Sequence, residues 1–150
     1  MKEKEVLKIY DIYLKKIYKL IGNKTTYENQ LNGAGKKLLG VKFKGVFPSD
    51  KIPKLNDLSP YCILNLDKSN EKGSHWVALV KTDKNEAIVY DSFGRNYKKI
   101  IPNLDISGNG RIINTDNDPE QHILETDCGS RCLSFIMVYD KYGKKAALKI

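Results

Sequence analysis

Cysteine is scarce in this chain of 150 residues, which contains only Cys62, Cys128 and Cys132. Three cysteines cannot all pair with one another, and their density is far below that of a disulfide-stabilised secreted scaffold. Long apolar runs are also lacking, since no stretch approaches the roughly 18 consecutive apolar residues that a membrane span needs. The first residues carry charges of both signs and do not resemble a secretory signal. We therefore expect an intracellular, reducing site of action and no membrane partner.

Acidic residues are outnumbered, with 26 Lys and Arg against 18 Asp and Glu, which gives a net charge of +8. A basic chain of this size attracts polyanions, so nucleic acid is one candidate partner. The lysines are nevertheless scattered along the whole chain, and no basic run or mixed aromatic and basic motif stands out. The charge alone leaves a second explanation equally open, in which the composition reflects only an AT-rich genome.

The length and the hydrophobic fraction of 41% fit a single domain, which we expect to span residues 1–150. Apolar residues recur every three or four positions between residues 2 and 21, just before Gly22, and predict an amphipathic helix. The glycines that follow predict turns at 32–35 and a loop over 40–53, with at most one short strand near 41–47.

Short β-prone runs at 61–66, 75–81 and 87–90 predict a meander of three strands, with a turn at 82–86. A fourth strand is expected at 111–114, after a loop over 102–110. A mostly buried helix is expected from 129 to 142, where Gly143 ends it. The order helix, sheet, helix predicts an α+β fold with a mostly antiparallel central sheet.

One cysteine lies where the last helix is expected to begin. Unpaired backbone N–H groups and the helix dipole stabilise a thiolate there, so Cys128 is the candidate nucleophile. Gly129 removes side-chain bulk beside it, so that a substrate carbonyl could approach the Cys128 backbone N–H. Gln121, seven positions earlier, could donate a second hydrogen bond to the developing oxyanion.

A base and an acid for this nucleophile flank the predicted hairpin. His75 begins one strand and Asp91 ends the next, so two antiparallel neighbours could bring the imidazole and the carboxylate within hydrogen-bond reach. Asp91 would hold the tautomer of His75 and stabilise the imidazolium. His75 would protonate the leaving amine and then activate water to hydrolyse the thioester.

Each of these residues also has a purely structural explanation. Cys132 and Cys62 are expected to be buried structural thiols, and Asp127 is expected to cap the last helix or hold the loop before it. His122 could replace His75 as the base, or join Cys128 and Cys132 in a zinc site. The zinc site is disfavoured, because the ligands are too few and their spacing is atypical. We therefore predict no metal.

The order of the site residues resembles that of a known superfamily. The chain has His-Trp at 75–76, Tyr-Asp-Ser-Phe-Gly at 90–94, Gln121, and Asp-Cys-Gly at 127–129. This is similar to the order His-Trp, Asp or Glu, Gln, Asp-Cys-Gly of the adenain and SUMO-protease superfamily. The segment 33–53, with its Gly-Val-Phe and Asp-Lys-Ile-Pro, resembles the loop that adenovirus-type maturation proteases place beside the substrate cleft. The resemblance covers about residues 30–140.

This resemblance implies a compact papain-like or adenain-like cysteine protease whose C-terminal helix carries the nucleophile. Its substrates would be viral capsid precursors, cleaved at glycine-containing sites, and Trp76, Gly129 and Gly45 would line the substrate site. Small size and richness in Lys and Asn suggest a virophage or related DNA virus, and thus a location in virions and host-cell virus factories. A monomer without cofactor is expected, with viral DNA as a candidate activator. The activating cysteine of adenain has no counterpart, and Asp91 stands where adenoviruses have Glu.

Two other classes of function stay open at this stage. The same fold and residue order could serve an isopeptidase that removes ubiquitin-like modifiers, or an acyltransferase. The compact chain argues against a modifier isopeptidase, because it leaves little surface to recognise a folded modifier. Alternatively, the chain could be a basic, non-catalytic nucleic-acid-binding module, which would bind DNA with a steep salt dependence.

Overall fold

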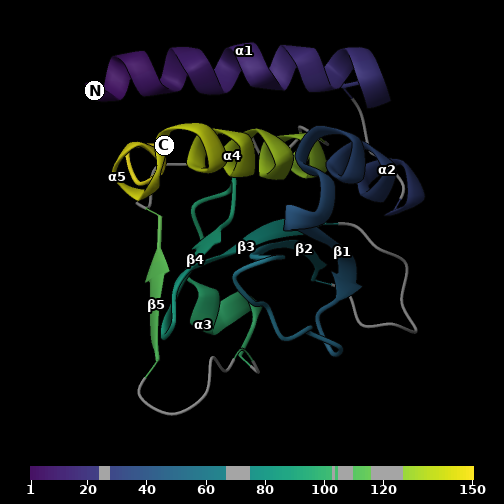
Figure 1. The fold of residues 1–150 in the computed structure, drawn as a ribbon, viewed down its shortest axis with the longest axis vertical. Coiled ribbons are helices and arrows are strands. Elements are labelled where there is room, and N and C mark those ends of the chain that lie inside the picture. The colour runs from purple at the N-terminus through teal and green to yellow at the C-terminus, as the bar shows by residue number, and fades with distance from the viewer. Residues whose placement is uncertain (24–27, 67–74, 103, 105–109, 116–126) are drawn as a thin grey trace.

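The computed structural model describes residues 1–23, 28–66, 75–102, 104, 110–115 and 127–150, which form layers of helices around one sheet (Figure 1). The helices are α1 (Glu3–Ile21), α2 (Glu28–Leu39), the 3-10 turn η1 (Gly40–Lys42), α3 (Tyr97–Ile100), α4 (Cys128–Tyr142) and α5 (Lys144–Ala147). The strands are β1 (Phe43–Pro48), β2 (Tyr61–Asn65), β3 (Trp76–Asp83), β4 (Glu86–Tyr90) and β5 (Arg111–Asn114). Helices α4 and α2 cover one face of the sheet, α1 lies outside α4, and α3 lies on the opposite face.

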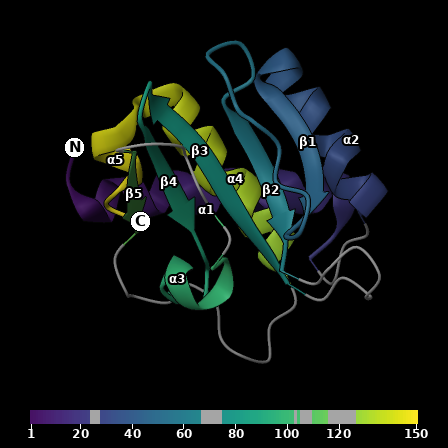
Figure 2. The same cartoon turned by 90° about the horizontal axis from the view of Figure 1, so that it is seen from below.

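The described strands form one sheet in the order β1-β2-β3-β4-β5, which Figure 2 shows from the α3 side. The pairings β2–β3 and β3–β4 are antiparallel, whereas β1–β2 and β4–β5 are parallel. The predicted combination of sheet and terminal helices is therefore present, but a mostly antiparallel sheet was the wrong expectation. Parallel neighbours require a crossover, and the segments between β1 and β2 and between β4 and β5 are long enough to provide one.

Helix α1 has the predicted position and face. Its buried residues are Val6, Tyr10, Leu14 and Ile17, at helical spacing. Gly22 follows with a φ of 85°, and its N–H donates to the carbonyl of Tyr18. Glycine is favoured where the backbone has a positive φ, and the helix ends here, so the predicted C-terminal stop is confirmed.

Helix α2 replaces the turns predicted at 32–35. The glycines in this segment suggested a break, but Gly35 faces Phe43 of β1 at very close range. A Cβ atom at Gly35 would lie 2.3 Å from the Phe43 ring. The glycine thus allows a helix to approach a strand, and it does not end the helix.

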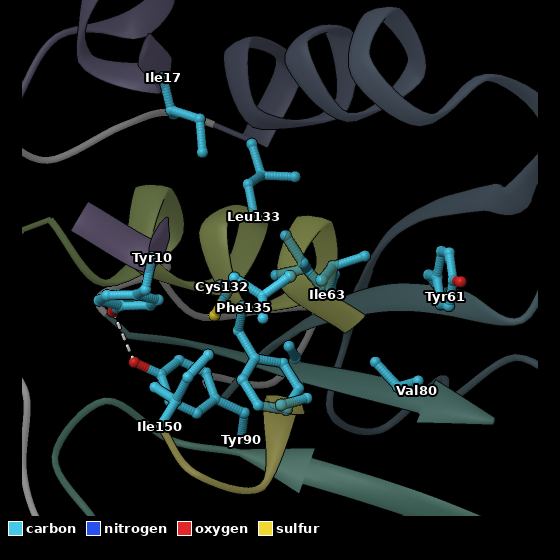
Figure 3. Packing of buried hydrophobic residues seen from close by; sticks show 14 of the residues in the cluster. Tyr10, Ile17, Tyr61, Ile63, Val80, Tyr90, Cys132, Leu133, Phe135 and Ile150 are labelled. Atoms are coloured by element: carbon cyan, nitrogen blue, oxygen red, sulfur yellow. Dashed lines mark hydrogen bonds between the residues drawn. The ribbon is translucent and has the colours of Figure 1, made fainter. Parts of the chain in front are cut away.

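The sheet is buried on both faces, and each face has its own apolar cluster. On the α4 side, Tyr90 stacks on Phe135 with ring centroids 4.4 Å apart, and its hydroxyl lies 2.7 Å from that of Tyr10 (Figure 3). On the other side, residues such as Leu64 and Leu79 form a smaller cluster with Ile101. The two clusters pack against the central strands from both faces, which restrains the positions of the strand ends.

The pairing register brings three strand ends to one edge of the sheet. Trp76, the first residue of β3, is opposite Asn65, the last residue of β2, and Tyr90 at the end of β4 is opposite Ala78. His75 immediately precedes β3 and Asp91 immediately follows β4. The two predicted catalytic residues therefore lie at the same edge of the sheet.

Candidate active site

The β3–β4 hairpin brings His75 and Asp91 into direct contact. The ring Nε2 of His75 lies 2.7 Å from Oδ1 of Asp91, and both residues are buried. A carboxylate accepts hydrogen bonds, so Nε2–H is the donor in this pair. The neutral imidazole then has Nδ1 as its unprotonated nitrogen. His75 is thus arranged to accept and return a proton through Nδ1.

Asp91 accepts hydrogen bonds from more than its histidine. Arg95 Nε donates to Oδ2 at 2.7 Å, and the backbone N–H of Phe93 donates to Oδ1 at 3.1 Å. Burial alone would raise the pKa of the Asp91 carboxyl, but the bonds from His75, Arg95 and Phe93 outweigh burial and hold this pKa below its ordinary value. The carboxylate is therefore ionised over the range in which the histidine would act.

One face of the His75 imidazole also packs against an aromatic ring. The Phe93 ring stacks on it with centroids 4.6 Å apart and an angle of 20° between the ring planes. The Arg95 guanidinium lies over the same Phe93 ring, 5.2 Å from its centroid. His75, Phe93, Arg95 and Asp91 thus form a closed ring of contacts that restricts the imidazole.

Cys128 is the first residue of α4, so it enters the helix as predicted, and its thiol contacts the backbone of Trp76, the first residue of β3. The backbone N–H of Trp76 interacts with the Cys128 sulfur, as does that of Gly129. The Trp76 N–H belongs to the peptide bond that joins His75 to Trp76, so the sulfur lies beside the backbone of His75. The nucleophile, base and acid of the predicted triad therefore converge at one edge of the sheet.

The protonation of Cys128 differs from the expectation based on the helix end alone. Burial raises the pKa of the Cys128 thiol above its ordinary value, although the N–H groups of Trp76 and Gly129 act in the opposite direction. The residue is only 4% exposed, which explains why desolvation dominates. A thiol whose pKa is raised in this way favours its protonated form, so a reaction at Cys128 would first need a base to take its proton.

Asp127 does not cap α4 with its side chain, contrary to one of its two predicted roles. Its carboxylate accepts hydrogen bonds from Nε of Arg131, at 3.0 Å to Oδ1, and from the hydroxyl of Tyr18 in α1. The residue before Cys128 thereby contacts both its own helix and the N-terminal helix. Asp127 thus has the structural role of fixing the start of α4.

The other two cysteines are buried, as predicted. Cys62 lies in β2 and Cys132 lies one turn after Cys128 in α4, and both are 0% exposed. Burial raises the pKa of the Cys62 thiol, and it raises that of Cys132 together with the nearby charges of Cys128 and Asp91. All three cysteines are free thiols. Cys128 is the one whose sulfur contacts the backbone N–H between His75 and Trp76, and it is the one that is not completely buried.

The remaining predicted site residues have diverse surroundings. Trp76 and Gly129 are buried, and the Trp76 side chain belongs to the core cluster on the α4 side. Gly45 has a φ of 143° and lines a pocket of about 650 Å³ between α2 and β1. Their contact with substrate stays a prediction. Gln121 and His122 lie outside the described residues. The predicted oxyanion donor Gln121 and the alternative zinc site with His122 therefore stay predictions.

Arg95 is the principal site residue that the sequence pattern did not reveal. It follows the Asp-Ser-Phe-Gly segment, in which Gly94 N–H donates to the carbonyl of Asp91 and closes a turn. That turn brings Arg95 back to the carboxylate four residues earlier. A basic residue four positions after a buried acid, across a glycine-containing turn, was the available signal.

Comparison with known proteins adds no family assignment, because no protein-family model and no curated protein matches the chain. None of the helices in the described part of the chain combines the length and apolarity needed to cross a bilayer.

Proposed function

We propose that this chain is a thiol-dependent hydrolase, and specifically a cysteine endopeptidase. The observation that carries the proposal is the contact of 2.7 Å between His75 Nε2 and Asp91 Oδ1, together with a buried Cys128 thiol at the backbone N–H that follows His75. A paired acid, a histidine with one free nitrogen and an adjacent thiol are the parts that acyl transfer through a thioester requires.

The proposed reaction begins with transfer of the Cys128 proton to Nδ1 of His75. The sulfur attacks the peptide carbonyl, and the resulting oxyanion is stabilised by the Cys128 backbone N–H and the Gln121 side chain. His75 then donates its proton from Nδ1 to the leaving amine, which leaves a thioester on Cys128. Water loses a proton to Nδ1 and attacks the thioester, which releases the acid and restores the thiol.

Within this class we propose an adenain-like maturation protease of a virophage or related DNA virus. The proposal is supported by the order of His-Trp, Asp, Gln and Asp-Cys-Gly along the chain and by the convergence of three of these elements in space. The substrates would be capsid precursors cleaved at glycine-containing sites in virions or virus factories. The protein would act as a monomer, and viral DNA is a candidate activator.

The decisive experiment combines the purified protein with a co-expressed capsid precursor, with and without DNA. We expect cleavage by the wild type and none by Cys128→Ala or His75→Ala. Asp91→Asn should lower kcat/KM by about 10²- to 10⁴-fold, because it removes the charge that stabilises the imidazolium. Circular dichroism would verify that each variant is folded, and mass spectrometry of the products would identify the cleavage site.

Other results would support a different function, either another enzyme of the same fold or a non-catalytic binding module. Reaction of Cys128 with a ubiquitin-like C-terminal tail or an acyl donor, in place of a precursor, would indicate an isopeptidase or an acyltransferase. No cleavage under any condition, together with steeply salt-dependent DNA binding, would indicate the basic binding module. That alternative has one observation in its favour, because α1 exposes several lysines along its outer side, namely Lys4, Lys8, Lys15 and Lys19.

A further inference from the structure

The charged residue nearest to the proposed acid has no assigned role in catalysis. Arg95 Nε lies 2.7 Å from Oδ2 of Asp91, and the backbone N–H of Arg95 also reaches Oδ2, at 3.3 Å. The carboxylate is almost fully buried, with its side chain 1% exposed, whereas the Arg95 side chain is 42% exposed. The arginine therefore lies at the rim of the site and holds one oxygen of a buried carboxylate.

The two oxygens of Asp91 have different partners. Oδ2 is bound by Arg95, while Oδ1 is bound by His75 Nε2 and by the backbone N–H of Phe93. A carboxylate held at both oxygens cannot rotate about its Cβ–Cγ bond without breaking charge-assisted hydrogen bonds. Arg95 thus fixes which oxygen faces the histidine.

A second contact leads from Arg95 to the histidine ring itself. The guanidinium packs over one face of Phe93, 5.2 Å from the centroid, and Phe93 stacks on His75 at 4.6 Å. Of the titratable groups on α4, Cys132 lies near Asp91, and Cys128 lies near Asp127, which is itself paired with Arg131. Among the groups described at this edge of the sheet, Arg95 is the cation that binds Asp91.

We infer that Arg95 is a positioning residue for the His75–Asp91 pair: it locks the carboxylate through Oδ2 and supports the imidazole through Phe93, so that Nδ1 stays directed to proton transfer. The inference depends on the proposed function, because it gives Arg95 a role in the same reaction. A positioning role predicts that loss of Arg95 weakens the His75–Asp91 hydrogen bond and lowers kcat while KM is unchanged.

The test compares Arg95→Gln and Arg95→Lys with the wild type in two measurements. Proton NMR would follow exchange of the His75 Nε2–H with solvent, which needs no substrate. We expect this exchange to be about tenfold faster in R95Q, since a charge-assisted bond that orders the carboxylate is lost. Precursor cleavage should show kcat lowered by about tenfold with KM unchanged. R95K, which keeps the charge but not the planar fork, should lie between the two.

Lys98→Gln is the matched control, because it removes an exposed cation from the adjacent helix α3 and leaves Asp91 untouched. It should behave as the wild type in both measurements. Thermal melting would verify that all variants are folded, and Phe93→Leu would test the second contact if R95Q is unfolded. R95Q values equal to those of K98Q would overturn the inference while the protease assignment stands. Absence of cleavage by the wild type would instead overturn the proposed function, and the role of Arg95 in it.

Discussion

At the residue scale, Asp91 shows how a buried charge is made stable. An unpaired carboxylate in a protein interior is destabilising by several kcal/mol, so burial of Asp91 requires donors. The donors are a histidine ring, a guanidinium and the backbone of the turn that follows β4. The same donors that make burial tolerable also orient the carboxylate toward His75.

Cys128 is predicted to differ from the other two thiols in its reactivity toward iodoacetamide. Its alkylation should be slow at neutral pH and accelerate as pH rises, because burial raises its pKa and the thiolate is the reactive form. It should still react faster than Cys62 and Cys132, which are completely buried. Mass spectrometry of peptides after timed alkylation at pH 7 and pH 9 would measure all three rates.

Two variants make this measurement specific. In His75→Ala, alkylation of Cys128 at pH 7 should slow further, because the neighbouring base is lost, while the rates of the two buried cysteines stay the same. Equal rates for all three cysteines in the wild type would contradict a distinct environment at Cys128. Full denaturation in urea should make the rates equal and serves as the reference.

The positions of the three central site residues could be predicted from the sequence, because hairpin pairing and a helix start are local patterns. His75, Asp91 and Cys128 do converge. The upward shift of the Cys128 pKa could not be predicted, since it depends on how much of the tertiary structure covers the thiol. Arg95 was missed because its contact depends on the detailed shape of one turn.

At the scale of elements, the contact between α2 and β1 determines how the edge of the sheet is covered. Lys36 of α2 donates through Nζ to the carbonyls of Phe43 and Lys44. Beside this contact, Gly35 faces the Phe43 ring. The helix thereby shields part of an edge strand, which is otherwise a site for unwanted pairing.

Gly35→Ala should destabilise the protein, because the added methyl group would lie 2.3 Å from the Phe43 ring. Overpacking of this kind typically lowers the free energy of unfolding by about 1–3 kcal/mol. Gly33→Ala is the matched control, since its Cβ would meet nothing within 4 Å in the same helix. It should stabilise by roughly 0.5–1 kcal/mol, because alanine loses less backbone entropy than glycine. Urea denaturation of both variants would measure the two changes.

Equal effects of G35A and G33A would show that α2 does not pack against β1 as described.

The packing role of Gly35 also explains why helix α2 was not predicted from the sequence. Leu31, Ala34 and Leu38 have the spacing of a helical face, but two glycines within five residues favoured turns. Glycine required for close packing cannot be distinguished from glycine required for a turn without knowledge of the neighbouring element. The parallel direction of β1 and β5 was missed for the same reason, since it depends on long connections.

At the scale of the whole molecule, α1 is joined to the site through polar contacts in the interior. Tyr10 pairs with Tyr90 of β4, Ser134 of α4 donates to the Tyr10 carbonyl, and Tyr18 donates to Asp127. These contacts cross from the outermost helix through α4 to the sheet. The N-terminal helix therefore stabilises the start of the helix that carries Cys128.

The stability of the whole fold should decline in acid, and Asp91 should contribute to that decline. Its pKa is lower in the folded chain than in the unfolded chain, so its contribution is complete above the unfolded value of about 3.9 and is lost as pH falls through the folded value. Urea denaturation at pH 7 and pH 3 should show a smaller pH-dependent loss in Asp91→Asn, which cannot titrate, than in the wild type. Asp57→Asn is the control, because this carboxylate is 95% exposed and pairs with Lys81 at the surface. An equal loss of unfolding free energy in D91N and the wild type would mean that Asp91 is not held as a buried, paired carboxylate in solution.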